Sequence, residues 1–351
     1  MATLVLLCHR HGRAGRLHMD MLSADIGGTQ SRFFRFSCED REISIKEGMV
    51  LSSRASTFDA LLEELFSKWP DGGKTLKGVS VLIFAAAGPV REGRVVMTNA
   101  SFAVDAAVAK ARFPWAECLV MNDFEAQAWA CCTPVMEQAE NLLPGGRAGR
   151  SFGVSALLRG RAPAAVIGAG TGLGAAWLIP GEGRPFVLPS EAGHVPFPFE
   201  GKQERDFADF MSARRGGAEV SAEHVLSGSG LALLHEYLGG APEKPAVFTR
   251  TPGFASSECC RCFARFYGRF CRMAALALLP ECVVLTGGVA GKTPALVRHE
   301  AFAGEFLRAR GGQKTFLEGV PVWLNAHPQA GLWGAARAGA AFAEKMGIGR
   351  S

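Results

Sequence analysis

The sequence predicts an α/β protein built from two domains. Its 351 residues exceed what one ordinary core accommodates and suit two domains. Hydrophobic residues make up 48% and charged residues 20%, so each domain can bury a substantial core, and a disordered chain is excluded. Short apolar segments with the character of strands alternate with segments of helical periodicity, an order typical of the α/β class.

The first domain is expected to open with strands and to continue with alternating helices and strands. Apolar residues recur at intervals of three and four over 58–66, which predicts a helix with one buried face that Thr57 can cap. The segment 118–121 reads as a buried strand with Asn122 and Asp123 at its C-terminal end. The other expected elements are strands at 22–26, 31–36, 42–51, 79–87 and 94–97, and a helix at 124–132.

A stretch rich in structure breakers, 134–163, marks the domain boundary. The second domain then opens with a strand at 164–167 that leads into a run of glycines. Its remaining expected elements are helices at 207–213, 230–237, 257–279 and 331–342, and strands at 281–285 and 321–325.

Composition excludes several classes of function. No apolar run approaches the roughly 20 residues that span a bilayer, and the basic residues are scattered although the net charge is +5, so neither a membrane nor a nucleic acid is expected as a partner. The ten cysteines lack zinc-site spacing and are expected to be reduced thiols. Residues 1–20 are interpreted as an extension, with Met19 or Met21 as the true start.

The glycine-rich segment 165–179 carries the most information. Gly170, Gly172 and Ala175 fit a GxGxxA pattern after a strand, which by itself suggests a dinucleotide-binding turn. Pro180 arrives too soon for the helix that such a turn must open, so a strand–turn–strand hairpin fits better. The segment 25–29 has the same pattern, and turns of this kind offer backbone N–H groups to phosphate oxygens.

A third glycine-rich segment, 285–293, leaves an alternative open. It nearly matches the phosphate-binding loop GxxxxGK[ST], except that Thr286 stands where the first glycine is required. A nucleotide hydrolase that uses Lys292 is therefore a rival hypothesis, although it would leave the other two glycine turns unexplained.

Together these segments resemble the bacterial glucokinase family, within the superfamily of sugar kinases, actin and heat-shock chaperone ATPases. The resemblance runs with gaps from about residue 24 to residue 337 and rests on the order and number of its motifs. The matching segments are 25–29 (DIGGT), 97–99 (MTN), 121–124 (MNDF), 168–174 (GAGTGLG), 188–195 (LPSEAGHV), 220–228 (VSAEHVLSG), 286–288 (TGG) and 327–332 (HPQAGL).

The resemblance implies a two-domain actin-like ATPase fold of the ribonuclease-H-like type, with a cleft between the domains. The small domain would hold 21–133 and a C-terminal helix at about 335–351, and the large domain 134–334. The implied reaction is ATP-dependent phosphorylation of glucose at its 6-hydroxyl, with Mg²⁺, by a cytoplasmic homodimer. A kinase for mannose or fructose, and a non-catalytic sugar or nucleotide sensor, stay open as alternatives.

The resemblance assigns a role to each site residue. Asp123 would be the catalytic residue that takes the proton of the attacking hydroxyl, because a carboxylate at a strand end facing a cleft can do so late in phosphoryl transfer. A helix cap is its structural alternative. The sugar would also bind to Asn99, Asn122, Glu191, His194 and Glu223. Asp25 would hold Mg²⁺ through water, and ATP would bind to Asp25, Gly27, Gly28, Thr29, Gly170, Thr171, Gly172, Gly287 and Gly288.

Several positions depart from the family pattern. Ser190 and Ala192 stand where the family has glycines, and a side chain disfavours positive φ. Cys271 and Arg272 stand where the family has a glycine–asparagine pair. These positions put sugar preference and adenosine contacts in question.

Overall fold

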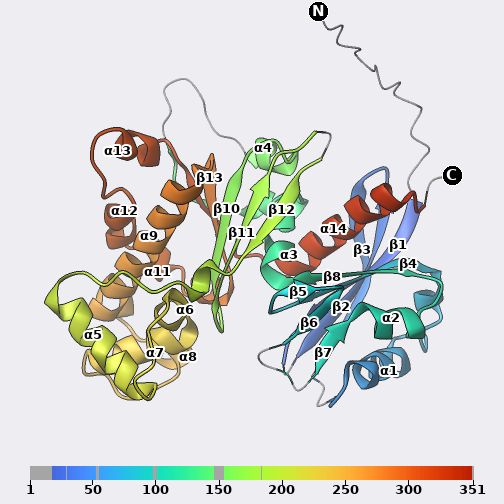
Figure 1. Ribbon diagram of the computed structural model, residues 1–351, viewed down its shortest axis with the longest axis horizontal. Helices are drawn as coiled ribbons and strands as arrows, with labels where there is room; N and C mark the ends of the chain where they lie inside the picture. The colour runs from blue at the N-terminus through green and yellow to red at the C-terminus, as the bar shows by residue number, and fades with distance from the viewer. Residues whose placement is uncertain are drawn as a thin grey trace, which may run out of the picture. The chain divides into compact units, whose positions relative to one another are not determined.

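The computed structural model describes residues 18–349 except 29, 53–54, 98–99, 101, 146–153 and 183 (Figure 1). Its chain divides into two compact units, one formed by Met1–Met121 with Ala336–Ser351 and the other by Asn122–Ala335. The boundary therefore falls twelve residues before the 133/134 junction expected from the sequence. The difference arises because helix α3 (Asp123–Ala130) packs against strands of the second unit.

The first unit contains a five-stranded sheet in the order β3-β2-β1-β4-β8. β1 and β2 form an antiparallel hairpin in which Ile26 pairs with Ser31, and β4 runs parallel to β1. The strands of the sheet are β1 (His18–Ile26), β2 (Ser31–Glu39), β3 (Glu42–Leu51), β4 (Val79–Ala86) and β8 (Glu117–Asn122). β1 begins at His18, so the last three residues of the expected N-terminal extension belong to the sheet.

Helices cover both faces of this sheet. α1 (Phe58–Lys68) begins where the sequence predicts, because the side chain of Thr57 accepts a hydrogen bond from the N–H of Ala60. The apolar residues of α1 and α2 (Ala106–Arg112) pack on Leu22, Ala24 and their neighbours in the sheet. On the opposite face Gly339 of α14 (Ala330–Met346) lies against Ile83 and Met21. A small sheet of β5 (Val90–Arg91), β6 (Arg94–Val96) and β7 (Ala103–Asp105) completes the unit, with a 3₁₀ turn at Thr75–Gly78.

The second unit contains a six-stranded sheet in the order β12-β11-β10-β13-β14-β9. It too begins with an antiparallel hairpin, β10–β11, and its next strand, β13, runs parallel to β10. Both glycine-rich segments thus lie at hairpin turns, as the sequence predicts. The strands are β9 (Glu140–Leu143), β10 (Ala164–Ala169), β11 (Leu173–Ile179), β12 (Phe186–Ser190), β13 (Cys282–Thr286) and β14 (Val322–Leu324).

Alternate residues of the central strand β10 face two different cores, as strand geometry requires. Ala165 and Ile167 pack with the long helix α9, while Ala164 and Val166 pack with α3 and α4. The helices on the α9 side are α5 (Gly201–Arg214), α6 (Ala222–Val225), α7 (Gly228–Tyr237), α8 (Pro245–Phe248), α9 (Glu258–Leu278), α10 (Gly288–Lys292), α11 (Ala295–Arg298), α12 (Glu300–Phe306) and α13 (Gly311–Glu318). α4 spans Val154–Leu158, and 3₁₀ turns lie at Pro134–Gln138, Ala192–His194 and Phe254–Ser256.

An ion cluster is buried where α9, α5 and α12 meet. The side chain of Arg269 is 1% exposed and donates hydrogen bonds to Glu204 Oε1 (3.0 Å) and Glu305 Oε1 (3.2 Å). It also donates to the carbonyl of Pro198 at 2.9 Å. Both carboxylates are nearly as buried as the guanidinium, so each charge depends on the others for its solvation.

Arg272, one of the departures from the family pattern, extends this cluster. Its guanidinium donates to the carbonyls of Glu305 (2.8 Å) and Arg308 (3.2 Å) at the C-terminal end of α12, while Cys271 is fully buried. Arg272 therefore adds a donor to two carbonyls at and just beyond the C-terminal end of α12, where intrahelical donors run out. Its place in the fold is structural, between α9 and α12.

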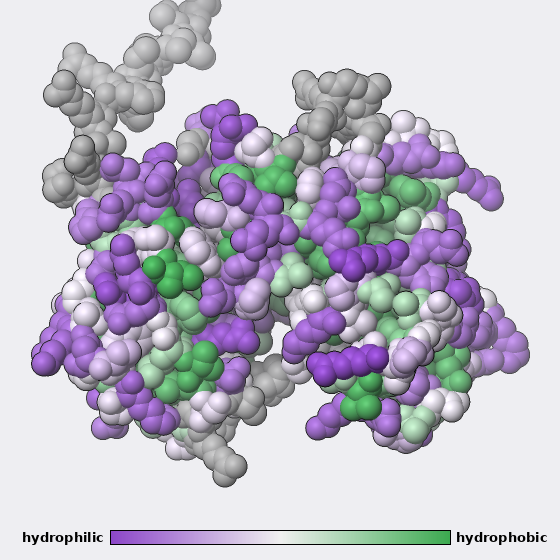
Figure 2. All heavy atoms as spheres, turned by 180° about the vertical axis from the view of Figure 1, so that it is seen from behind, coloured by the Kyte–Doolittle hydropathy of each residue, from purple (hydrophilic) through white to green (hydrophobic). Residues whose placement is uncertain are grey.

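Surface and thiol properties complete the description. On the face drawn in Figure 2, the described hydrophobic residues form separate patches among hydrophilic ones. No helix in the described part of the chain is long and apolar enough to cross a bilayer. The nine described cysteines are free. Burial raises the pKa of eight of these thiols and brings that of Cys260 to about 11.

Candidate active site

The turn of the β10–β11 hairpin holds three of the predicted phosphate-binding residues, Gly170 to Gly172. The N–H of Gly170 donates to the carbonyl of Gly172 at 2.7 Å, and its carbonyl accepts from the N–H of Gly228 at 2.9 Å. Because the chain returns as strand β11 and opens no helix, the dinucleotide-binding alternative is wrong. The turn is held in place by the start of α7.

Two further contacts fix the end of β10, directly before this turn. The buried hydroxyl of Tyr267 on α9 accepts the N–H of Ala169 at 3.2 Å. Gly287 lies against the carbonyl of Ala169, where a Cβ would come within 2.6 Å of the oxygen, and its φ is +87°. Glycine is needed at 287 for both reasons. The structure thus brings Gly287 and Gly288 beside the Gly170–Gly172 turn.

The phosphate-binding loop alternative is not supported by this geometry. That motif needs an open loop before a helix that starts at the lysine. Here residues 288–292 already form α10, and Lys292 is its last residue.

Three of the predicted sugar-binding residues gather around Leu173, the first residue of β11. Glu223 in α6 accepts the N–H of Leu173 through Oε2 at 3.2 Å. Gly193 lies against the carbonyl of Leu173, where a Cβ would come within 1.9 Å of the oxygen. The residues on either side of Gly193 are thereby held next to the hairpin, and Glu191 Oε2 lies 3.4 Å from His194 Nε2.

The side chains of Glu191 and His194 are 54% and 61% exposed, so a polar ligand can reach both. The two departures in this loop do not strain it. The N–H of Ala192 donates to Ser190 Oγ at 3.1 Å, a local turn that serine favours. The described non-glycine residues with positive φ are Asp40, Arg41, Glu92 and Leu279, so Ala192 has an ordinary backbone.

Asp123 is the first residue of α3, but it is not the helix cap. Asn122 is the cap: its Oδ1 accepts the N–H groups of Phe124 (2.8 Å) and Glu125 (3.3 Å). The carboxylate of Asp123 accepts the N–H of Phe124 at 3.0 Å through Oδ1. Because Asn122 already caps the helix, the structural alternative for Asp123 loses its basis.

Sequence reasoning missed two features of α3. The ring of Phe124 lies against Gly168 and Gly174 of the hairpin, and Gln127 Oε1 accepts the hydroxyl of Thr286 at 2.9 Å. Phe124 and both glycines stand inside recognised motifs, yet their contact joins segments some 45 residues apart in sequence. No local sequence pattern predicts such a contact.

Glu125 gives this helix a pH-dependent stability. Burial raises the pKa of its carboxyl to about 6, and hydrogen bonding to the backbone of Asn122 opposes the rise. The folded protein therefore binds the carboxyl proton of Glu125 more tightly than the unfolded chain does. As the pH rises from the ordinary pKa of a glutamate through about 6, the free energy of unfolding falls.

Glu125→Gln is expected to remove that fall, making the variant more stable than the wild type above pH 6 by up to about 2 kcal/mol. Urea unfolding between about pH 4.5 and pH 8 measures it. The exposed Glu219→Gln is the control, with an unchanged profile. Identical pH profiles for Glu125→Gln and the wild type would contradict the prediction.

The first unit holds the other predicted nucleotide residues. Asp25 lies near the end of β1, and the following turn is closed by the N–H of Gly27, which donates to the carbonyl of Gln30 at 3.1 Å. Gly28 in this turn is exposed. Thr29 and Asn99 lie outside the described residues.

The carboxyl of Asp25 suits a divalent cation. Burial raises its pKa, and the guanidinium of Arg32, 4.0 Å from Oδ2, opposes that rise. The side chain is nevertheless 42% exposed, and Oδ2 lies beyond hydrogen-bonding distance of Arg32, so a ligand can reach the carboxylate. An additional cation with a preference for oxygen ligands, such as Mg²⁺, fits this environment.

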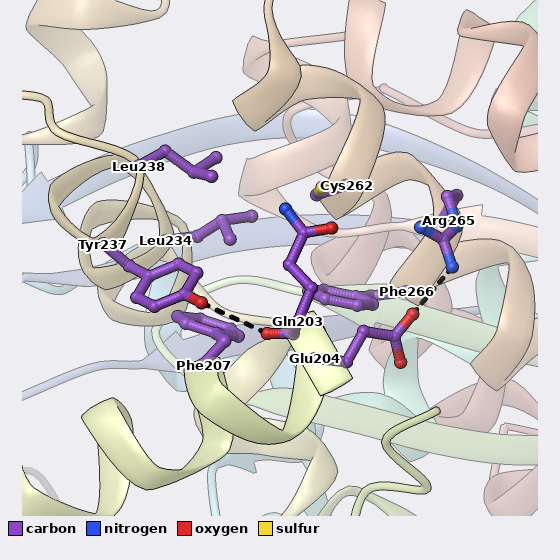
Figure 3. A pocket seen from close by; sticks show the side chains of 9 residues that line it. All are labelled: Gln203, Glu204, Phe207, Leu234, Tyr237, Leu238, Cys262, Arg265 and Phe266. Carbon is purple, nitrogen blue, oxygen red and sulfur yellow. Dashed lines mark hydrogen bonds and ion pairs between the residues drawn. The ribbon is translucent and has the colours of Figure 1, made fainter. Parts of the chain in front are cut away.

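A small pocket lies elsewhere, between α5, α7 and α9 (Figure 3). Its volume of about 10 Å³ holds roughly one water molecule. The hydroxyl of Tyr237 donates to the carbonyl of Gln203 at 3.3 Å, and Arg265 pairs with Glu204 at 2.7 Å (Figure 3). The remaining lining is mainly apolar, so this pocket suits neither a sugar nor a nucleotide.

Comparison with known sequences identifies the family of the chain. The family profile described as Glucokinase matches residues 22–342. A glucokinase of Pseudomonas paraeruginosa is 31% identical, with 93% of each chain covered. A glucokinase of Klebsiella pneumoniae is 32% identical, with 89% of this chain and 94% of that protein covered.

Solved structures agree as well. The glucokinase of an Antarctic psychrotroph has a TM-score of 0.72 at 25% identity, with 91% of this chain and 98% of that chain covered. A glucokinase of the ROK family from Streptomyces griseus, in complex with glucose and AMPPNP, shares the fold with a TM-score of 0.54 at 19% identity, with coverages of 92% and 99%. The expected actin-like ATPase fold is confirmed. Over nearly its whole described length, this chain belongs to the glucokinase family.

Proposed function

We propose that the protein transfers the γ-phosphoryl group of ATP to the 6-hydroxyl of glucose, giving glucose 6-phosphate and ADP. The observation that carries this proposal is the grouping of Glu191, His194 and Glu223 around Leu173, next to the Gly170–Gly172 turn. Hydroxyl-binding groups and a phosphate-binding turn are thereby joined in one unit. Membership of the glucokinase family and the glucose and AMPPNP bound by the Streptomyces griseus neighbour support it.

Asp123 would act on the attacking hydroxyl. Its carboxylate hydrogen-bonds the 6-hydroxyl and takes the proton as the oxygen attacks phosphorus. Asn122 uses its Oδ1 as a helix cap, so its NH₂ group would contact the sugar. Glu191, His194, Glu223 and Asn99 would pair with the remaining hydroxyls and so select against sugars that lack one.

The nucleotide phosphates would bind at the two hairpin turns, which are Gly27, Gly28 and Thr29 in the first unit and Gly170, Thr171 and Gly172 in the second. The N–H groups of Gly27 and Gly170 close these turns, so the N–H groups of Gly28, Thr29, Thr171 and Gly172 would be the donors, with Gly287 and Gly288 beside the adenosine. Mg²⁺, held by Asp25 through water, would neutralise phosphate charge.

The proposed reaction is tested by a coupled assay for ADP release with Mg-ATP and a panel of hexoses. Turnover with glucose, and little with galactose or fructose, is the expected result. Turnover with mannose or fructose in place of glucose would keep the kinase and change the acceptor. Folded protein that turns over no hexose would overturn the proposal in favour of a sensor.

We also infer a cytoplasmic homodimer. The cytoplasm is where ATP is available to a kinase, and the dimer follows from the resemblance to bacterial glucokinases. Light scattering of the purified protein at assay concentration measures the oligomeric state. A monomer mass would refute the dimer and leave the proposed reaction untouched.

A further inference from the structure

We propose that Phe124 is a positioning residue, whose ring on the glycine pair (Gly168 and Gly174) sets where Asp123 stands relative to the phosphate turn. This inference rests on the proposed function, because it concerns the geometry of that phosphoryl transfer. It assigns to two glycines of the motif a purpose other than phosphate binding.

The glycine pair faces the ring directly. Gly168 and Gly174 are cross-strand partners in the β10–β11 hairpin. A Cβ at Gly174 would come within 1.8 Å of Phe124 Cδ2, and one at Gly168 within 2.9 Å of Cε1. Real side chains never approach so closely, so the ring occupies space that a side chain at Gly174 would fill. At Gly168 a Cβ would also meet the carbonyl of Thr286 at 2.7 Å, so that glycine is required by both the ring and β13.

The other glycines of the motif have different surroundings. A Cβ at Gly170 would meet no atom within 4 Å. At Gly172 it would meet Glu223 Oε2 at 2.1 Å. The middle of the segment 168–174 thus forms the turn, and the glycines at its two ends contact the ring of Phe124.

The ring is linked rigidly to both parts of the reaction site. On one side, Phe124 follows Asp123 directly, and its N–H is held by both Asn122 Oδ1 and Asp123 Oδ1. On the other side, each glycine of the pair lies two residues from the turn. A shift of the ring therefore moves either the carboxylate or the turn.

α3 has little freedom to absorb such a shift elsewhere. Gly334 of α14 lies against its backbone, where a Cβ would come within 1.7 Å of the carbonyl of Ala126. Gln127, one turn after Asp123, bonds Thr286 at the end of β13. The rest of α3 is held in place by these contacts. A displacement of the Phe124 ring is therefore accommodated by a movement of the first turn of α3, which carries Asp123.

Gly174→Ala tests the inference. Its methyl group is expected to displace the ring and lower kcat about 100-fold, while the KM for glucose changes less than about threefold, because a misplacement near 1 Å costs that much in phosphoryl transfer and little in binding. Gly304→Ala on α12, where a Cβ meets nothing within 4 Å, is the matched control with unchanged kcat.

Rescue separates positioning from general damage. In Gly174→Ala/Phe124→Leu the smaller side chain makes room for the methyl group, and kcat is expected to recover at least about fivefold over Gly174→Ala. If Gly174→Ala does not fold, Phe124→Leu alone serves: the inference requires a fall in kcat of about tenfold with an unchanged KM for glucose.

A normal kcat in folded Gly174→Ala, an absence of rescue in the double variant, or equal changes in kcat and KM would each overturn the inference. Failure of the proposed function looks different. In that case the wild type itself turns over no hexose, whereas failure of the positioning role leaves an active wild type.

Discussion

Asp123→Asn is expected to lower kcat for glucose phosphorylation by about 100-fold to 10,000-fold. The amide keeps the size of the side chain and can still contact a hydroxyl, but it cannot take the proton. Asn122 rather than Asp123 caps α3, so the helix start should survive the substitution. Binding of glucose without ATP, measured by calorimetry, should therefore change little.

The control for this experiment is Asp206→Asn on α5. Asp206 is 44% exposed and pairs with Lys202 at 2.7 Å, and it is none of the predicted site residues. Its kcat should match the wild type. Near-normal turnover in Asp123→Asn would show that another group accepts the proton.

Arg269→Leu is expected to lower the free energy of unfolding by about 3–5 kcal/mol. The substitution takes from Glu204 and Glu305, which are 6% and 5% exposed, the most deeply buried of their cations. Glu204 keeps Arg265 and Glu305 keeps Arg272, but both arginines are more exposed than Arg269, so the loss of this buried cation costs more than the apolar leucine returns. Urea unfolding at neutral pH measures the change.

Arg261→Leu on the same helix is the matched control. Arg261 is 44% exposed and pairs with Glu258 at the surface, where an ion pair contributes less than about 1 kcal/mol. Similar losses in the two variants would mean that the burial of the cluster is not what makes Arg269 important.

Local patterns allowed much of the fold to be predicted. Helix α1 begins at Phe58 behind its Thr57 cap, and both glycine turns join antiparallel strands, because spacing and turn chemistry act over a few residues. Pro180 directly follows β11, and its position in the sequence already argues against the helix that a dinucleotide-binding turn must open.

Contacts between distant segments were out of reach. That α3 belongs to the second unit depends on Phe124 meeting Gly168 and Gly174, and nothing in residues 118–132 reveals this partner. In the same way, the sequence allowed Asp123 to be read as the helix cap. Only the backbone geometry assigns that role to Asn122.

The last helix has a consequence for the order in which the protein is made. The second unit, Asn122–Ala335, is one uninterrupted stretch of chain, whereas the first unit needs Ala336–Ser351. During synthesis, the second unit can close its core while the sheet formed by β1 and β4 still waits for α14 to cover Met21 and Ile83. The part translated first is therefore completed last, and a chain truncated after Ala335 would expose that face for recognition by chaperones.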